Sequence, residues 1–152
     1  MDSQGSASEE HLPDDVRGLL RERVESYEEL ETLLALERLR AQGKTVEELS
    51  AVVRVNTPLI ERALRVLESR SLIEQRASAT TGARGGAARP ERRYFYAPAS
   101  AELDNAVRAL AQAYAEQPIP IIKLMSENAI QRLRTGAARA YADAFILRKK
   151  QE

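Results

Sequence analysis

The chain has 152 residues, 43% of them hydrophobic and 30% charged, with a net charge of zero, which is typical of one soluble domain with room for a helical extension. It has no Cys and a single His, which excludes cysteine-ligated zinc, disulfides and thiol chemistry. No apolar run approaches the roughly 18 residues of a membrane span, and the polar N-terminus has no signal-peptide core, so we expect a cytoplasmic protein.

The charge is distributed unevenly along the chain. Residues 1–50 carry 6 basic and 13 acidic side chains, a net charge of −7. Residues 51–100 carry 9 basic and 4 acidic side chains, a net charge of +5, and the remaining residues carry 8 and 6, a net charge of +2. This distribution indicates a phosphate-facing patch in the middle of an otherwise neutral protein.

The first predicted elements are a tail and two helices. Residues 1–11 are polar and acidic, and we expect them to be disordered. Pro13 and the acids after it open a short helix, because they suit the first helical turn. Ser26 and Glu29 form a capping box that starts a second helix, which we expect to run to about Gln42 and to end at Gly43. Its leucine-rich face predicts the first core helix of the domain.

The next two predicted helices are separated by three residues. Thr45 begins a second capping box and a helix from Val46 to about Val53, with its inward side at Leu49, Val52 and Val53. A turn at residues 54–56 follows, and then Thr57 as N-cap and Pro58 at the first helical position start another helix. This is the spacing of a helix-turn-helix, although two core helices of another all-α fold would look similar.

The second helix of this pair has two distinct faces. Its inward stripe is Ile60, Ala63, Leu64 and Leu67, and two arginines lie on the opposite side. Arg and Asn side chains can make bidentate contacts to guanine and adenine edges in the major groove. The alternative is that the arginines are solvated or pair with Glu61 and Glu68. The candidate DNA-contacting residues of this helix and turn are Arg54, Asn56, Thr57, Glu61, Arg62 and Arg65.

A β-hairpin is predicted after the helix pair. Leu72–Arg76 and Arg92–Ala97 read as strands, and the run from Ala77 to Glu91 is too long and glycine-rich for an ordered turn. A mobile basic tip suits contacts to the DNA backbone or minor groove, whereas the alternative is a surface loop with incidental arginines. The candidate wing residues are Arg76, Arg84, Arg89, Arg92 and Arg93. The order of elements predicts a winged helix-turn-helix.

The segment TVEELSAVVRVNTPLIERALRVLESRSLIEQ, with RPERRYFYAPASAEL after it, resembles winged-helix transcriptional regulators of the MarR, PadR, TrmB and ArsR kind. Their recurring pattern is matched here by Arg62-Ala63-Leu64, Leu67-Glu68, Leu72-Ile73 and Arg92-Arg93-Tyr94, and the likeness covers about residues 27–103.

The resemblance implies that the helix from Thr57 enters the major groove. It also implies that Arg89, Arg92 or Arg93 approaches the minor groove or the phosphates. Two residues depart from the pattern: Ser71 stands where the family usually has Gly in a left-handed turn, and Glu61 stands where small polar or basic residues are usual.

Two helices are predicted after the wing. Ser100 caps a helix from Ala101 to about Glu116, and Pro118 and Pro120 then break it. The last helix, from about residue 121 to 148, would be about 40 Å long, which exceeds what the core of a small winged domain needs. We interpret it as a dimerisation arm, the alternative being a helix folded back on its own domain. The residues of the predicted interface are Ile122, Met125, Ala129, Leu133, Ala137 and Tyr141.

The sequence therefore predicts a mainly α fold with a small β-hairpin wing. Residues 12–99 would form the winged helix-turn-helix domain and residues 100–152 the arm. No combination of side chains typical of an enzyme, a metal site or a cofactor site is present. We expect a bacterial DNA-binding transcriptional regulator that acts as a homodimer on double-stranded DNA. The alternative is a winged-helix module that binds a protein partner in a transcription or chromosome-associated assembly.

Overall fold

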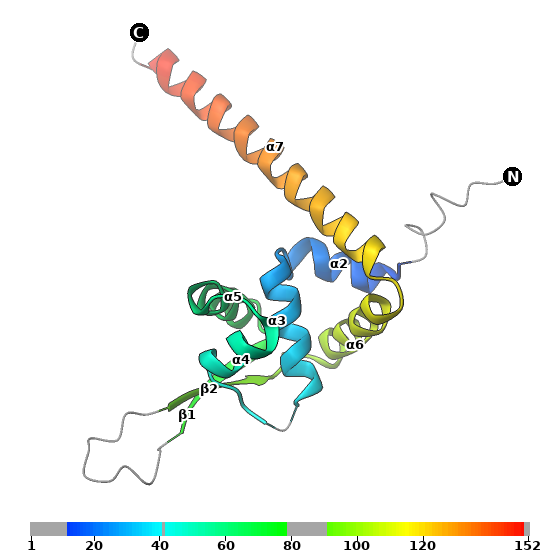
Figure 1. The fold of residues 1–152 in the computed structure, drawn as a ribbon. Coiled ribbons are helices and arrows are strands. Elements are labelled where there is room, and N and C mark those ends of the chain that lie inside the picture. The colour runs from blue at the N-terminus through cyan, green and yellow to red at the C-terminus, as the bar shows by residue number, and fades with distance from the viewer. Residues whose placement is uncertain (1–11, 41, 79–90, 151–152) are drawn as a thin grey trace, which may run out of the picture.

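The computed structural model describes residues 12–40, 42–78 and 91–150. The tail predicted for residues 1–11 and the tip of the wing, with Arg84 and Arg89, lie outside these ranges. The described ranges contain six helices and one antiparallel hairpin (Figure 1). In chain order they are α2 (Asp14–Glu22), α3 (Tyr27–Arg38), α4 (Val46–Val53), α5 (Thr57–Ser69), β1 (Ile73–Ser78), β2 (Glu91–Tyr96), α6 (Ala101–Glu116) and α7 (Pro118–Lys150). The predicted winged helix-turn-helix is confirmed.

Helix α3 forms the centre of the core. It packs against α4, α5, α6 and β2, and Leu30, Leu33 and Leu36 on it are fully buried. Only half of the predicted capping box forms at its start. The Glu29 backbone N–H donates to Ser26 Oγ over 3.1 Å, whereas Glu29 Oε1 accepts from the backbone N–H of Glu25 and not from that of Ser26. Burial of one leucine side chain stabilises a fold by about 1.5–3 kcal/mol, so this leucine face alone explains the helix's central place.

Helix α3 ends at Arg38, four residues before the predicted end at Gln42. The chain leaves the helix early because the segment before α4 pairs with the wing. Lys44 and Tyr94 exchange two backbone hydrogen bonds of 3.0 and 2.9 Å. The Phe95 ring lies against Gly43, where a Cβ atom would come within 2.4 Å of the ring. Gly43 therefore permits this close approach and does not serve as the helix terminator that we predicted.

The first helix of the helix-turn-helix pair matches its prediction at both ends. The Glu48 backbone N–H donates to Thr45 Oγ1 over 3.2 Å, and Glu48 Oε1 accepts from the Thr45 backbone N–H over 2.9 Å. The inward position predicted for Val52 is wrong, since its side chain is 51% exposed. The side of α4 that packs on the core runs through Val46, Leu49 and Val53, which leaves Val52 outside.

Helix α5 begins one residue earlier than predicted. Thr57 is its first residue and Pro58 its second, so Asn56 occupies the N-cap position that we assigned to Thr57. The Asn56 side chain makes no capping hydrogen bond, and Pro58 lies in the first turn, where a missing backbone N–H removes no intrahelical bond.

Among the residues that the structure describes, two other than glycine have left-handed backbone conformations. They are Arg54, at the end of α4, with φ of 63°, and Ser71, after α5, with φ of 64°. The value at Ser71 confirms the left-handed turn that the family resemblance implied. An L-residue in this region costs roughly 1–2 kcal/mol relative to the right-handed helix.

Replacing Ser71 with Gly is expected to raise the free energy of unfolding by up to about 1 kcal/mol, because Gly adopts positive φ without steric cost. Urea unfolding followed by circular dichroism measures the change. Ser126→Gly, inside α7, is the matched control and is expected to lower the free energy of unfolding by about 0.5 kcal/mol. A lower urea midpoint for Ser71→Gly would contradict the argument.

The C-terminal helices lie on the same side of the core as α2. Helix α6 has its predicted bounds, and Ser100 caps it by accepting from the Leu103 backbone N–H over 3.1 Å. Helix α7 begins at Pro118, earlier than residue 121, because both prolines fit in its first turn. Helix α2 packs against both α6 and α7, so α2, α6 and the first turns of α7 form one helical layer.

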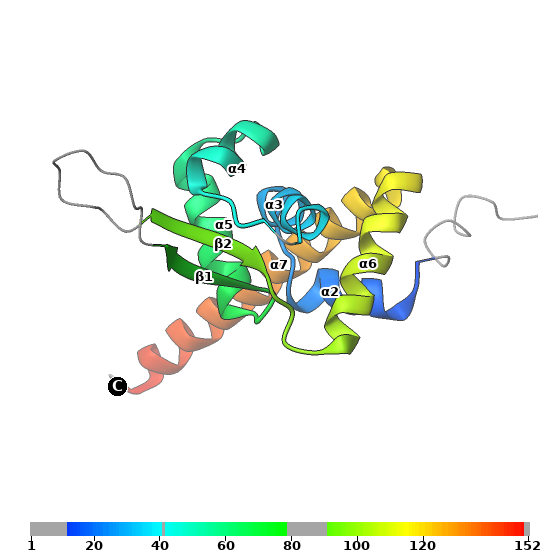
Figure 2. The ribbon, with the colours of Figure 1, turned by 90° about the horizontal axis from the view of Figure 1, so that it is seen from below.

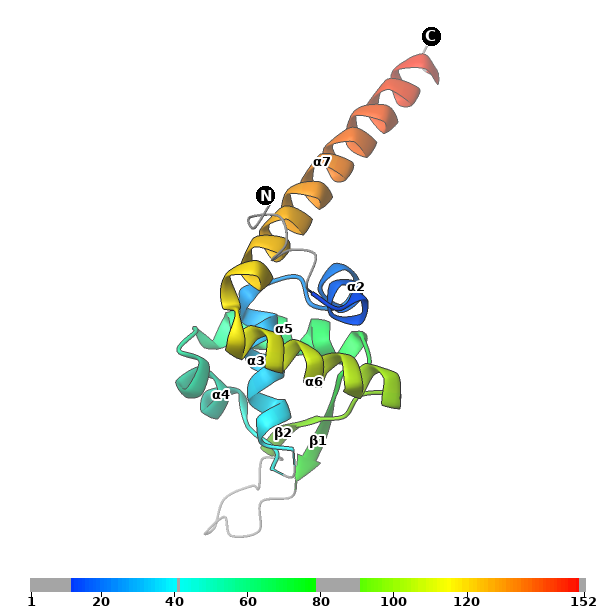
Figure 3. The same ribbon diagram turned by 90° about the vertical axis from the view of Figure 1, so that its right-hand side faces the viewer.

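The first turns of α7 join the core, and the rest projects from the body of the protein. Ile121 and Met125 are buried, whereas the side chains of residues 133–144 are all exposed. In Figures 1 and 3 the helix extends away on one side of the molecule, and the hairpin extends on the other. Within the described ranges no helix is long and apolar enough to cross a membrane.

Candidate nucleic-acid interface

Helix α5 presents one buried and one exposed face. Ile60, Ala63, Leu64 and Leu67 are buried, as the sequence pattern predicted. Because the helix is fixed by this stripe, its other face is solvent-exposed at Glu61, Arg62 and Arg65. The rotation of α5 about its axis is therefore set by the core, and the two arginines project from a rigid element.

The turn before α5 adds further exposed polar side chains. Arg54, Asn56 and Thr57 are all exposed. The turn is held by the Arg54 backbone N–H, which donates to the Ser50 carbonyl over 2.8 Å, and by Ser50 Oγ, which donates to the Val55 carbonyl over 2.5 Å. These bonds support the left-handed conformation of Arg54, so a strained but fixed turn carries the first basic residue of this face.

The cations of this face lack ion-pair partners among the described residues. Arg54, Arg62, Arg65 and Arg92 form no salt bridge there, and in particular Arg62 and Arg65 do not pair with Glu61 or Glu68. Six arginines elsewhere are paired with carboxylates, namely Arg40, Arg70, Arg76, Arg93, Arg108 and Arg132, whereas Arg21, Arg38, Arg134 and Arg139 on other helices also form no ion pair among the described residues. Unpaired exposed arginines gathered on one face are available to an external anion.

The arginines at the base of the wing differ in their contacts. Arg93 is half-buried: its Nη1 donates to the Gly43 carbonyl over 2.9 Å, and it pairs with Glu91 and Glu48. Its guanidinium therefore joins β2 to the start of α4, which leaves Arg89 and Arg92 as the other two arginines that the family resemblance offered for contact with DNA. Arg76 is exposed, but it pairs with Glu74 and stacks 4.5 Å from the centre of the Phe95 ring.

Arg92 is the wing arginine of the described strands that remains exposed without an ion pair. It shares a face of β2 with Tyr94, which packs on the core. Burial raises the pKa of Tyr94, and the charges of Glu61, Arg65 and Glu68 act on the same hydroxyl. The base of the wing thus lies beside α5, as Figure 2 shows, and one surface can include Arg92 and the exposed face of α5.

A polar cluster that the sequence did not reveal holds the end of the wing. Tyr96 Oη donates to Asp104 Oδ1 over 2.7 Å, and Arg40 Nη2 lies 2.9 Å from the same oxygen. Arg108 Nε lies 3.2 Å from Asp104 Oδ2, and Arg40 stacks 5.1 Å from the centre of the Tyr96 ring. These contacts join β2, α6 and the end of α3. Arg40 and Asp104 are 64 residues apart in the chain, so no local pattern could indicate their pairing.

Acid is expected to destabilise the fold through Asp104. The Tyr96 hydrogen bond, followed by the charges of Arg40 and Arg108, lowers the pKa of Asp104 below its usual 3.8. The carboxylate therefore contributes stability that is complete above the unfolded-state pKa and is lost as the pH falls through the lower, folded-state value. Asp104→Asn should lower the free energy of unfolding at neutral pH by on the order of 1 kcal/mol, and this deficit should shrink in acid. Urea unfolding at about pH 7 and about pH 3 measures it, and a deficit equal at both would contradict the linkage.

The fold and the exposed basic face define a winged helix-turn-helix protein with a helical C-terminal extension. No protein-family model and no curated protein sequence matches the chain. Solved structures of MepR from Staphylococcus aureus do match. The MepR–DNA complex aligns with 91% of this chain and 93% of its own, at 16% identity and a TM-score of 0.51. MepR in its DNA-binding conformation aligns with 86% and 88%, at 15% identity and a TM-score of 0.50. At such identities the likeness shows the fold.

Proposed function

We propose that this protein is a homodimeric DNA-binding transcriptional regulator. Helix α5 would enter the major groove, and the wing would contact the backbone or the minor groove. The observation that carries the proposal is the exposed face with Arg54, Arg62 and Arg65, none of which is ion-paired within the described ranges. Because the chain as a whole has a net charge of zero, these exposed and unpaired arginines indicate a binding site for a polyanion such as DNA.

The comparison with MepR supports the same function. MepR has the same fold and has been solved in complex with DNA. A winged helix-turn-helix places the N-terminal part of its second helix at the base edges. In this chain that part holds Thr57, Glu61 and Arg62, of which Arg62 can read guanine and Glu61 can accept a hydrogen bond from cytosine. A regulator of this kind would act in the cytoplasm and would need no metal or cofactor.

The homodimer is proposed from the exposed apolar residues of α7. Ile122, Ile130, Leu133 and Tyr141 are exposed on this helix, and Ala129 and Ala137 lie in the same predicted stripe. Met125, which we also predicted at the interface, is buried in the chain's own core. Pairing of two copies would let two α5 helices bind half-sites about one helical turn apart.

Selection of bound sequences from a random pool of duplex DNA tests the function. A dimer should enrich a near-palindromic site, and its affinity should fall steeply with salt because phosphate contacts release counterions. Measuring the dissociation constant for the enriched site at several salt concentrations gives the slope of that dependence. Absence of any enriched or non-specific binding at about 50 mM salt would contradict the proposal.

A protein-binding module is the second candidate. It is favoured by the exposed apolar side chains of Val52 and Leu59 on α4 and α5, together with the acidic Glu61 on the same helix pair. Apolar residues at the centre of a protein interface typically carry much of its binding energy, whereas DNA-facing surfaces are mainly polar and basic. A chain that fails the DNA selection but gives a stoichiometric complex with a co-purified partner, abolished by Val52→Asp, would support this function instead.

A further inference from the structure

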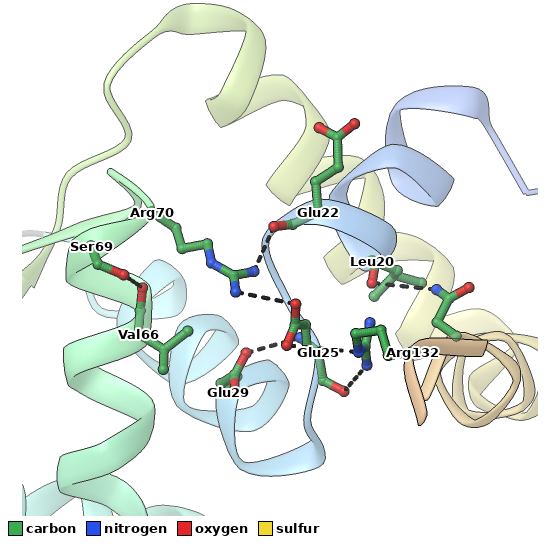
Figure 4. Close-up of polar contacts among 9 residues, drawn as sticks. Leu20, Glu22, Glu25, Glu29, Val66, Ser69, Arg70 and Arg132 are labelled. Atoms are coloured by element: carbon green, nitrogen blue, oxygen red, sulfur yellow. Dashed lines mark hydrogen bonds and ion pairs between the residues drawn. The ribbon is translucent and has the colours of Figure 1, made fainter. Parts of the chain in front are cut away.

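A cluster of charged side chains joins the end of α5 to α7, as Figure 4 shows. Glu25 lies in the short connection between α2 and α3. One of its carboxylate oxygens, Oε1, is 3.1 Å from Arg70 Nη2, and the other, Oε2, is 3.8 Å from Arg132 Nε. Arg70 is the C-cap residue of α5 and Arg132 belongs to α7. A single carboxylate therefore lies between the helix proposed to bind DNA and the helix proposed to pair two copies.

The backbone around Glu25 is held from both sides. From the α5 side, Arg70 Nη1 donates to the Glu22 carbonyl over 2.5 Å, and the Arg23 guanidinium donates to the Arg70 carbonyl. From the α7 side, Asn128 Nδ2 donates to the Leu20 carbonyl over 3.4 Å. The Glu25 backbone N–H itself donates to Glu29 Oε1 over 2.9 Å. The connection is thus fixed between two elements that lie far apart in the sequence.

The cluster lies where α7 leaves the core, so its geometry affects the direction of the projecting part of the helix. Helix α7 has 33 residues, and Arg132 lies where the helix leaves the core, before the fully exposed stretch that begins at residue 133. At about 1.5 Å per residue, the part of α7 beyond Arg132 is about 27 Å long. A small rotation of α7 against α5 at the cluster would move the far end of the arm by several ångströms.

We propose that Glu25 is a positioning residue that sets the angle between α5 and α7. In a dimer joined through α7, this angle fixes the separation of the two α5 helices and hence the preferred spacing of the DNA half-sites. The inference rests on the proposed function for its consequence on DNA, but the angle itself is a property of one chain. Without the Glu25 charge, Arg70 and Arg132 lose the ion pairs that join them through one carboxylate and keep only their hydrogen bonds to the backbone, so the angle loses this electrostatic restraint.

Loss of the Glu25 charge is expected to change the angle between α5 and α7 more than it changes the free energy of unfolding. The side chains of Glu25, Arg70 and Arg132 are each about one-third exposed, and ion pairs in such surroundings add little to the free energy of unfolding. Glu25→Gln should therefore keep the thermal midpoint within a few degrees while it broadens the distribution of α5–α7 angles. Glu25→Asp, which keeps the charge, should restore part of the wild-type distribution.

Distances between two spin labels measure the angle directly. Because the chain has no Cys, Ser69→Cys on α5 and Thr135→Cys on α7, both at exposed positions, provide the only two labelling sites. Labelled chain diluted in unlabelled chain reports the distance within one copy. The wild type should give one narrow distribution and Glu25→Gln a broader or displaced one, whereas the control Glu127→Gln, an exposed acid on α7, should match the wild type. Equal distributions for wild type and Glu25→Gln would overturn the proposal.

DNA duplexes with the two half-sites moved apart or together by single base pairs provide the second measurement. The wild type should prefer one spacing, and Glu25→Gln should weaken that preference by up to about fivefold, the range that one partly exposed ion pair can supply. Its affinity for a single half-site should stay unchanged. Unaltered spacing preference in Glu25→Gln would refute the role of Glu25 while the DNA-binding function stands. If the wild type bound no DNA, the proposed function would be refuted. The distances between the spin labels would still test whether Glu25 sets the angle between α5 and α7.

Discussion

Replacing Arg62 and Arg65 together with Ala is expected to lower the affinity for the selected DNA site by about a hundredfold or more. Both side chains project from the exposed face of α5 and have no carboxylate partner in the described chain. A bidentate contact to a base contributes about 1–3 kcal/mol of discrimination, and a phosphate contact contributes to affinity on every sequence. Fluorescence anisotropy with the selected duplex, at one fixed salt concentration, measures the loss.

Single substitutions distinguish whether Arg62 and Arg65 contact a base or a phosphate. If Arg62 contacts a base, Arg62→Ala should relax the enriched sequence at one position of each half-site. If Arg65 contacts a phosphate, Arg65→Ala should weaken binding to all sequences alike and reduce the salt slope by about 1 per site. The control is Arg21→Ala with Arg38→Ala, which removes two exposed arginines without ion pairs from α2 and α3. Equal enrichment of the same site by the wild type and the double Arg62/Arg65 variant would exclude α5 as the recognition helix.

Leu133→Glu with Tyr141→Glu is expected to convert a dimer into a monomer. The two side chains are 73% and 76% exposed, so in one chain they contact little, and the substitutions should change the free energy of unfolding of a monomer by less than about 0.5 kcal/mol. In a dimer two carboxylates per chain would have to be buried without partners, which is strongly unfavourable. Sedimentation velocity measures the mass of the species in solution.

The same double variant should bind the selected palindrome about a hundredfold less tightly, because each half-site is then bound without the effective concentration that linkage provides. Gln131→Glu with Thr135→Glu introduces the same charge at exposed polar positions of α7 and is the control. A variant that remains dimeric, or a wild type that is monomeric at the concentrations at which it binds DNA, would show that these two α7 residues do not form the interface.

The parts of the fold that depend on neighbouring residues could be predicted from the sequence. The capping box at Thr45 and the Ser100 cap fixed the starts of α4 and α6, and both helices have the predicted bounds. The apolar stripe of α5 likewise identified which side chains are exposed. These signals are reliable because each acts within one or two helical turns.

The features that the sequence did not predict depend on long-range contacts. Helix α3 ends early because Lys44 pairs with Tyr94, 50 residues later in the chain. Arg93 looked like a wing arginine, but it is held by Gly43 and Glu48, which precede it by 50 and 45 residues. Basic residues near the wing are therefore indistinguishable in sequence, and only their partners separate a structural arginine from one that is free to bind an anion.

The contact between Gly43 and Phe95 has a consequence for how this protein can vary. A Cβ atom at position 43 would overlap the Phe95 ring at 2.4 Å, so a larger residue there requires the ring to move away or a smaller residue at position 95. Substitutions at positions 43 and 95 are therefore expected to depend on each other. Relatives of this chain should keep the glycine together with the aromatic residue or lose both, and such a pair of correlated substitutions would identify the same wing attachment in chains too divergent to align by overall identity.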